Sequence, residues 1–254
     1  MMVVLRHLVN NRRLKGVFAA SRAASSVATS PTISKTPQYI DFVDNWPANE
    51  KESILNDFIV LPDFVSVEEE KLLIEEVDPY MKRLKYEFDH WDDAIHGFRE
   101  TERKHWYPHN KKVIQKIAEI AFKGQIMPHI HILDLAENGV IKPHVDSSRY
   151  CGTTIAGLSL LSDSVMRLVR TDETKYMQTK NGSNADEYRT LPKSLNATSS
   201  FYADVLLKQR SLYIMRDTSR YNFTHEILGN EHGYFKGEKV TKTRRISVIC
   251  RNSP

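Results

Sequence analysis

The chain has 254 residues, 41% of them hydrophobic and 27% charged, which excludes a disordered or collagen-like chain. Two cysteines, Cys151 and Cys250, exclude a disulfide scaffold and a four-cysteine zinc module, and no apolar run of about 18 residues is present to span a membrane as a helix. The net charge of +4 comes from residues 1–40, because residues 41–254 hold 30 basic and 32 acidic residues, a balance that disfavours nucleic-acid binding.

The first segment, residues 1–35, is predicted to be a mitochondrial transit peptide and linker. Apolar residues alternate with Arg and Lys, a Ser/Ala-rich stretch follows, and acids are absent, as is typical of import signals. An ordinary basic tail is the alternative. We expect cleavage between residues 20 and 40, and a polar linker over residues 31–52.

The domain itself is expected over residues 55–252, beginning with a strand at 58–61. Ser66 and Glu69 form a capping-box pattern that predicts a helix up to Pro79. Residues 85–91 alternate as in a strand, and apolar spacing predicts a second helix over 110–122. Between them, 92–108 is expected to be an aromatic and basic loop that covers a barrel mouth or contacts a protein; stacking on a flipped base is the less favoured alternative.

After Lys123 the pattern changes to short strands bounded by Gly, Asn, Asp or Pro, expected at 127–135, 140–146, 153–161, 165–169, 201–206, 211–215, 220–226 and 244–251. Many short strands without intervening helices predict a mainly β fold with flanking helices, an antiparallel sandwich or barrel. Residues 171–200 are expected to be an exposed polar insertion. The basic cluster Lys236–Arg245 is expected to be a solvated hairpin flank, and both cysteines to be small buried residues.

His144 and Asp146 are the first candidate metal ligands. They lie two apart in a predicted strand, so their side chains share a face and can reach one ion. A second histidine would complete a facial triad of two histidines and one carboxylate, which suits Fe(II) and leaves open coordination positions. The His-x-Asp pattern alone is weak, since His90 and Asp92 form another such triplet.

The distal histidine has four candidates: His225, His129, His131 and His232. His225 is favoured because the last predicted strand follows it with Arg245, Ser247, Ile249 and Arg251 on one face. A guanidinium that points into a barrel is costly unless an anion meets it, and a dicarboxylate would form a bidentate pair with it.

With these residues in order, the chain resembles the Fe(II)/2-oxoglutarate dioxygenases of the AlkB family, in particular a mitochondrial branch in animals. The resemblance is carried by IKPHVDS, IAGLSLLS, SVMRLV, SLYIMR, HEIL and RRISVICR and covers residues 55–252 except the insertion. It implies a double-stranded β-helix (jelly roll) with His144, Asp146 and His225 as iron ligands.

The resemblance also implies the co-substrate site. Arg245 would pair with the distal carboxylate of 2-oxoglutarate, with the Tyr213 hydroxyl nearby. Arg251 would lie near the other end of the co-substrate, although a surface ion pair is its alternative. Ile246 and Ser247 would line the same pocket.

The function that follows from the resemblance is a monomeric oxygenase of the mitochondrial matrix that uses Fe(II), 2-oxoglutarate and O2. We expect it to hydroxylate a protein or a small metabolite, with links to fatty-acid metabolism and programmed necrosis. Two alternatives are kept: a demethylase of methylated RNA or DNA, and a non-catalytic iron-binding interaction protein.

Overall fold

A computed structural model of the chain describes residues 37–88, 94–171 and 201–254. The predicted transit peptide, the insertion after Thr171 and the second His-x-Asp triplet at His90 lie outside the described residues.

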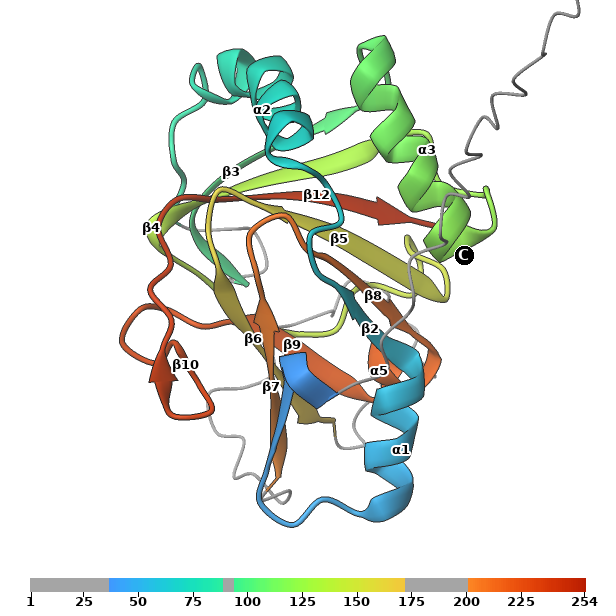
Figure 1. The fold of residues 1–254 in the computed structure, drawn as a ribbon, viewed down its shortest axis with the longest axis vertical. Helices are drawn as coiled ribbons and strands as arrows, with labels where there is room; N and C mark the ends of the chain where they lie inside the picture. Colours follow the sequence, from blue (N-terminus) through green and yellow to red (C-terminus); the bar gives the residue numbers. More distant parts are fainter. Residues whose placement is uncertain (1–36, 89–93, 172–200) are drawn as a thin grey trace, which may run out of the picture. The chain divides into compact units, whose positions relative to one another are not determined.

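Most of the strands belong to one antiparallel sheet with the order β1-β7-β6-β9-β4-β12-β5-β8-β2, and β3 also pairs with β4 (Figure 1). The strands are β1 Ile40–Val43, β2 Phe58–Leu61, β3 Ile95–Arg103, β4 Ile130–His144, β5 Thr154–Leu160, β6 Ser164–Arg170, β7 Tyr202–Leu207, β8 Leu212–Arg216, β9 Phe223–Ile227 and β12 Arg245–Arg251. A small hairpin contains β10 Tyr234–Phe235 and β11 Glu238–Lys239. The helical elements are η1 Pro37–Tyr39, α1 Ala48–Asp57, α2 Val67–Met81, α3 Pro108–Phe122 and α5 Asp217–Tyr221.

Strand β4 divides this sheet into two layers. Its first half, up to Leu135, pairs with β12, and its last residues, Ile141 and His144, pair with β9. One layer is therefore β4-β12-β5-β8 and the other β4-β9-β6-β7. Strands β5, β8 and β12 thus lie in one layer and β6, β7 and β9 in the other, which is the strand arrangement of a double-stranded β-helix. The predicted fold is confirmed, except that the two strands predicted at 127–135 and 140–146 are one continuous strand.

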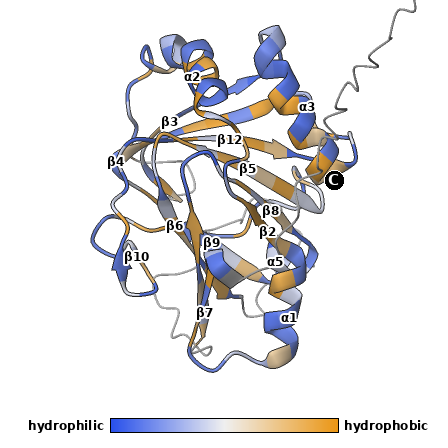
Figure 2. Ribbon diagram, viewed as in Figure 1, coloured by the Kyte–Doolittle hydropathy of each residue, from blue (hydrophilic) through white to orange (hydrophobic). Residues whose placement is uncertain are grey.

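The opposite faces of the strands pack into two different hydrophobic cores. Along β12, Ile246, Val248 and Cys250 pack in the core beneath α2 and α3, while Ile249 contacts the core between the two layers. Hydrophobic and hydrophilic residues accordingly mix along these strands and helices (Figure 2). Cys151 and Cys250 are both buried free thiols, as expected, and burial raises the pKa of Cys250 to about 12. Within the described ranges, no helix has the length and apolarity needed to cross a membrane.

Both predicted helices are present. At the start of α2 the backbone N–H of Glu69 donates to Ser66 Oγ (3.1 Å), and the Ser66 N–H donates to the Glu69 carboxylate (2.8 Å). The helix continues past Pro79 to Met81, because a proline near the end removes only one backbone donor there. Helix α3 ends at Lys123, which has the left-handed conformation common at such ends.

The predicted linker at 31–52 is wrong in its described part, because β1 and the first half of α1 lie there. Strand β1 pairs with β7, with Ile40 opposite Val205, and extends the edge of the sheet. Within residues 38–57 only Ile40 and Ile54 are buried, so the stretch carries a weak apolar pattern. Its structure depends on partners far away in the chain.

The segment before α3 also differs from the prediction. The expected loop at 92–108 contains β3, whereas the expected strand at 85–91 is represented in its described part by a single bridge between Glu87 and Phe98. Strand β3 contains several charged residues, so its sequence resembles that of a solvated loop. In the folded chain, residues from other elements neutralise these charges. Arg103 donates to Glu76 at 2.6 Å, for example. A further correction concerns 220–226, where α5 ends at Tyr221 before β9 begins.

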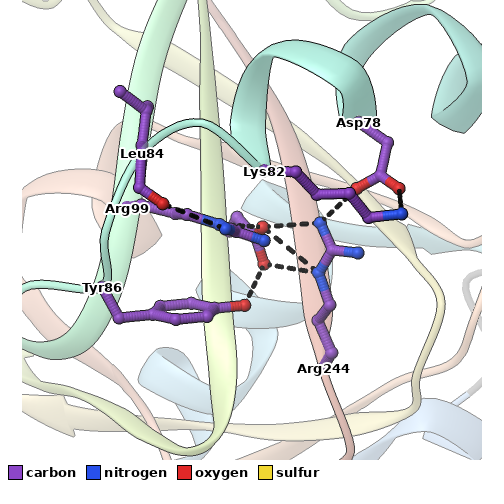
Figure 3. A network of polar contacts seen from close by, with 7 residues as sticks. Asp78, Lys82, Leu84, Tyr86, Arg99 and Arg244 are labelled. Atoms are coloured by element: carbon purple, nitrogen blue, oxygen red, sulfur yellow. Dashed lines mark hydrogen bonds and ion pairs between the residues drawn. The ribbon is translucent and has the colours of Figure 1, made fainter.

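A buried charge cluster joins β3, β4, α2 and the residue that precedes β12 (Figure 3). Asp134, with no exposed surface, accepts hydrogen bonds from Arg99 Nε (2.7 Å), Arg244 Nη2 (2.7 Å) and the Tyr86 hydroxyl (3.1 Å). Arg244 also reaches Asp78 at 2.6 Å. Arg244 is therefore a structural residue, which corrects the expectation that it belongs to a solvated flank.

We predict that Asp134→Asn destabilises the protein by about 3–5 kcal/mol, because two guanidinium groups lose their shared buried counter-charge. Urea unfolding measures this change. Glu119→Gln is the matched control: Glu119 is exposed on α3, and its replacement should change the free energy of unfolding by less than about 0.5 kcal/mol. A loss below about 1 kcal/mol in Asp134→Asn would mean that the cluster is not a stabilising unit.

Candidate metal and co-substrate site

Two side chains from neighbouring strands and one from the segment after β4 meet between the layers. His144 ends β4 and lies opposite His225 of β9, while Asp146 follows two residues after His144. One ligand atom from each residue lies within 4.8 Å of the other two, and the two imidazole centres are 4.2 Å apart. The sequence-based triad is therefore confirmed, including the choice of His225.

The donors are oriented for metal binding. The Nδ1 of His144 lies 2.9 Å from the Lys142 carbonyl oxygen, so an Nδ1–H can donate there and leave Nε2 as a ligand. The Nε2 of His225 lies 3.5 Å from Asp146 Oδ2, so these two atoms face the same point.

The charge states of the donors also suit a metal. Burial and, after it, the charge of His144 lower the pKa of His225 to about 3, so its imidazole is neutral. Burial alone would raise the pKa of Asp146, but His225 and His144 in their protonated forms, together with Arg251 and Arg220, outweigh burial and hold that pKa well below its usual range. A neutral imidazole and an ionised carboxylate are the forms that bind a divalent cation.

The other candidate histidines are elsewhere. His131 Nε2 lies 2.7 Å from a carboxylate oxygen of Glu100, so an Nε2–H can donate there and leave Nδ1 to accept from Arg251 at 3.4 Å. His129 and His232 are exposed. Among the described residues, the triad is the one group of at least three such side chains arranged to hold a metal.

Arg245 lies on the interior face of β12 and is only 2% exposed. Its Nη2 donates to Ser159 Oγ at 2.8 Å, while its Nε is buried without a hydrogen-bond partner among the described residues. Tyr213, on β8, is close enough for its hydroxyl to interact electrostatically with Arg245. Burial raises the pKa of this hydroxyl to about 12, so it remains a hydrogen-bond donor at any physiological pH.

Arg251 lies beside the triad and not in a surface ion pair. Its Nη2 is 3.8 Å from Asp146 Oδ1, and its Nε is another buried atom without a described partner. Ser247 is on the same face of β12 and is 2% exposed. Ile246 differs, because its side chain packs in the core beneath α2 and α3, so that any contact it makes with the pocket comes from its backbone.

Two residues of β5 that the sequence analysis missed shape this pocket. Ser159 holds Arg245, and Gly157 lies opposite Tyr213, where a Cβ would be 2.3 Å from the tyrosine ring. Gly157 therefore provides the space in which the ring lies. A signal exists in the sequence, since small residues at 157 and 159 alternate with the apolar Ala156, Leu158 and Leu160.

The arrangement fits Fe(II) and 2-oxoglutarate. Two imidazoles and one carboxylate on one side form the donor set of a facial triad, which leaves positions for other ligands. Buried guanidinium nitrogens of Arg245 and Arg251 without described partners supply hydrogen bonds that an anion can accept. The metal ligands and the arginines of the co-substrate site thus each include a buried nitrogen that lacks a hydrogen-bond partner among the described residues.

Comparison with known proteins agrees with this chemistry. No protein-family model matches the chain. The "Alpha-ketoglutarate-dependent dioxygenase alkB homolog 7, mitochondrial" of Bos taurus and that of Mus musculus are each 43% identical over 198 residues, which is 77% of this chain and 78% of theirs. A solved structure described as "The structure of OsALKBH1" shows a TM-score of 0.49 and 10% identity, covering 77% of this chain and 98% of that one.

The two mammalian relatives are matched over more than two thirds of their length, and the matched region of this chain folds as a double-stranded β-helix around His144, Asp146 and His225. This chain belongs to the AlkB family of Fe(II)/2-oxoglutarate-dependent dioxygenases, in its alkB homolog 7 branch.

Proposed function

We propose that this protein is an oxygenase of the mitochondrial matrix that hydroxylates a protein or a small metabolite with Fe(II), 2-oxoglutarate and O2. The observation that carries the proposal is the His144–Asp146–His225 triad, with Arg251 3.8 Å from Asp146. Arg245 is buried on the same strand as Arg251. When bound, this set of cofactors supplies the oxidation: one oxygen atom enters a substrate C–H bond and the other enters succinate, with release of CO2.

The residues of the chain bind and orient. His144, Asp146 and His225 would hold the metal on one face, so that its remaining positions point into the interior. Arg245, fixed by Ser159, would pair with the distal carboxylate of 2-oxoglutarate, and the Tyr213 hydroxyl would donate to the same group. The apolar core between the layers keeps water from these contacts and strengthens them.

The names of the relatives and the charge distribution of the chain support the proposed location and substrate class. The relatives are named mitochondrial, and residues 1–35 have the composition of an import signal. Residues 41–254 carry a net charge of −2, which favours a protein or metabolite over a nucleic acid. The links to fatty-acid metabolism and programmed necrosis, and a monomeric state, are proposed from the resemblance to the family alone.

We predict that metal and co-substrate binding can be separated by mutation. His144→Ala should weaken Mn(II) binding at least about 100-fold, because a ligand is lost. Arg245→Met should weaken 2-oxoglutarate binding about 100-fold, through loss of a buried charge partner, and change Mn(II) affinity less than about threefold. Electron paramagnetic resonance measures bound Mn(II), and calorimetry measures 2-oxoglutarate binding to the Mn(II)-loaded full chain.

Arg167→Met is the matched arginine control, because Arg167 is paired with Asp204 on neighbouring strands and has no contact with the triad. It should leave both affinities unchanged. Equal loss of metal and co-substrate in Arg245→Met would refute the role assigned to Arg245.

We predict that Tyr213→Phe weakens 2-oxoglutarate binding about 10- to 100-fold, the value of one hydrogen bond to a charged group. Because the pKa of Tyr213 is raised to about 12, the hydroxyl stays protonated, and the ratio of the two affinities should be constant from about pH 6.5 to about pH 9. Calorimetry at several pH values checks this, with Tyr202→Phe as control. A ratio that falls towards pH 9 would show that the hydroxyl ionises near the usual phenol pKa.

The proposed activity is tested by succinate release from the full chain with Fe(II), ascorbate, 2-oxoglutarate and O2. Candidate substrates come from mitochondria, captured on wild-type protein loaded with Mn(II) and an unreactive 2-oxoglutarate analogue. Hydroxylation of a captured protein or metabolite supports the proposal. Capture and demethylation of RNA, with binding that weakens steeply with salt, would favour the demethylase instead. Absence of succinate with every candidate would favour a non-catalytic role.

A further inference from the structure

Arg220 is a buried cation that has no part in binding the metal or 2-oxoglutarate as proposed above. It lies on α5, just before β9, and none of its surface is exposed. Its Nε and both Nη atoms lack a hydrogen-bond partner among the described residues, and its guanidinium carbon is 4.8 Å from the centre of the Tyr221 ring. One face of the group is thus stacked on an aromatic ring, while its polar edge has no acceptor in the described chain.

Such an arrangement is costly, because a buried guanidinium without an acceptor loses its hydration and gains little in return. The fold nevertheless holds α5 in place. The Thr218 N–H donates to Asp57 Oδ2 (3.1 Å), and the Ser219 hydroxyl donates to the carbonyl oxygen of Asp57 (3.0 Å). Since α5 is anchored to α1 by these contacts, Arg220 is kept in the interior.

The guanidinium shares its interior with the metal ligands. Helix α5 ends at Tyr221 and β9 begins at Phe223, so the buried Arg220 lies five residues before His225, on the helix that leads directly into the strand of that ligand. Its charge also interacts with Asp146 and with Cys151, in the segment that follows β4. Arg220 is therefore buried next to β9, in electrostatic reach of the triad.

The co-substrate does not account for this third guanidinium. 2-Oxoglutarate has two carboxylates, for which Arg245 and Arg251 are available. A ferrous ion and a doubly ionised 2-oxoglutarate cancel each other's formal charge, so these cofactors add no net negative charge to the site. Asp146 interacts electrostatically with both Arg220 and Arg251, and Glu102, which also acts on Arg251, is exposed. With both carboxylates of 2-oxoglutarate assigned to other arginines, the guanidinium nitrogens of Arg220 still lack a hydrogen-bond acceptor among the described residues.

We propose that Arg220 binds an anionic oxygen group of the primary substrate, a carboxylate or a phosphoryl group, and holds it beside the metal. The proposal rests on the oxygenase function proposed above, and it implies that the primary substrate of the oxygenase is an anion. A planar guanidinium with a vacant edge suits two oxygen atoms of one such group. Fixing this group would determine which C–H bond of the substrate faces the metal.

The test uses the full chain loaded with Mn(II) and saturating 2-oxoglutarate, without turnover. Acetate and inorganic phosphate are the two probes, followed by the paramagnetic broadening of their ¹³C and ³¹P resonances, which reports an anion close to the metal. We expect one saturable site in the wild-type protein, and the probe that binds more tightly distinguishes a carboxylate from a phosphoryl substrate. Arg220→Met should weaken this binding at least about tenfold, as expected for loss of one charged hydrogen-bonding partner.

Two further variants sharpen the result. Arg220→Lys keeps the charge but loses the planar edge and should weaken the anion several-fold less than Arg220→Met does. Arg216→Met is the matched control, because Arg216 adjoins α5 but its Nη2 donates to carbonyls of α3, and anion binding should be unchanged.

The outcomes separate this proposal from the oxygenase function. If wild-type protein holds Mn(II) and 2-oxoglutarate but neither anion, the proposal is wrong, even where Arg220→Met does not fold. If Arg220→Met loses 2-oxoglutarate as Arg245→Met does, Arg220 belongs to the co-substrate site and the proposal is also wrong. Failure of the wild-type protein to bind Mn(II) and 2-oxoglutarate would overturn the proposed function itself.

Discussion

The pairing of β4 with β9 is the constraint on which the site depends. It places His144 directly opposite His225, and the segment that follows His144 brings Asp146 to the same point. Because strand side chains alternate between faces, a shift of one residue in this pairing would turn one of the imidazoles away from the interior. Metal binding is therefore a property of strand register, which the buried apolar residues on both layers fix.

The sequence predicted those elements whose signals are local. The capping box at Ser66 and the apolar spacing of α3 each identify a helix within one short window. Strand β3 could not be recognised in this way, because its charged residues, such as Arg99 and Arg103, look solvated until Asp134 and Glu76 are placed beside them. The edge strand β1 likewise has little apolar pattern of its own, and its pairing with β7 comes from a distant part of the chain.

The site shows the same division. His144 and Asp146 follow from the two-residue period of a strand, whereas the choice of His225 needed Arg245 and the family resemblance. The sequence did not identify Ser159 or Arg220, because the role of each depends on which side chains and groups surround it in the folded chain. Sequence patterns thus identify residues that act through spacing, and miss those that act through cross-strand neighbours.

Strand β4 carries Asp134, the centre of the charge cluster, and ten residues later His144, with the passage from one layer to the other between them. No loop separates the two residues, so a substitution that displaces this strand at the cluster is expected to displace a metal donor as well. Natural sequence variation at the cluster would then be selected for ion affinity in addition to conformational stability.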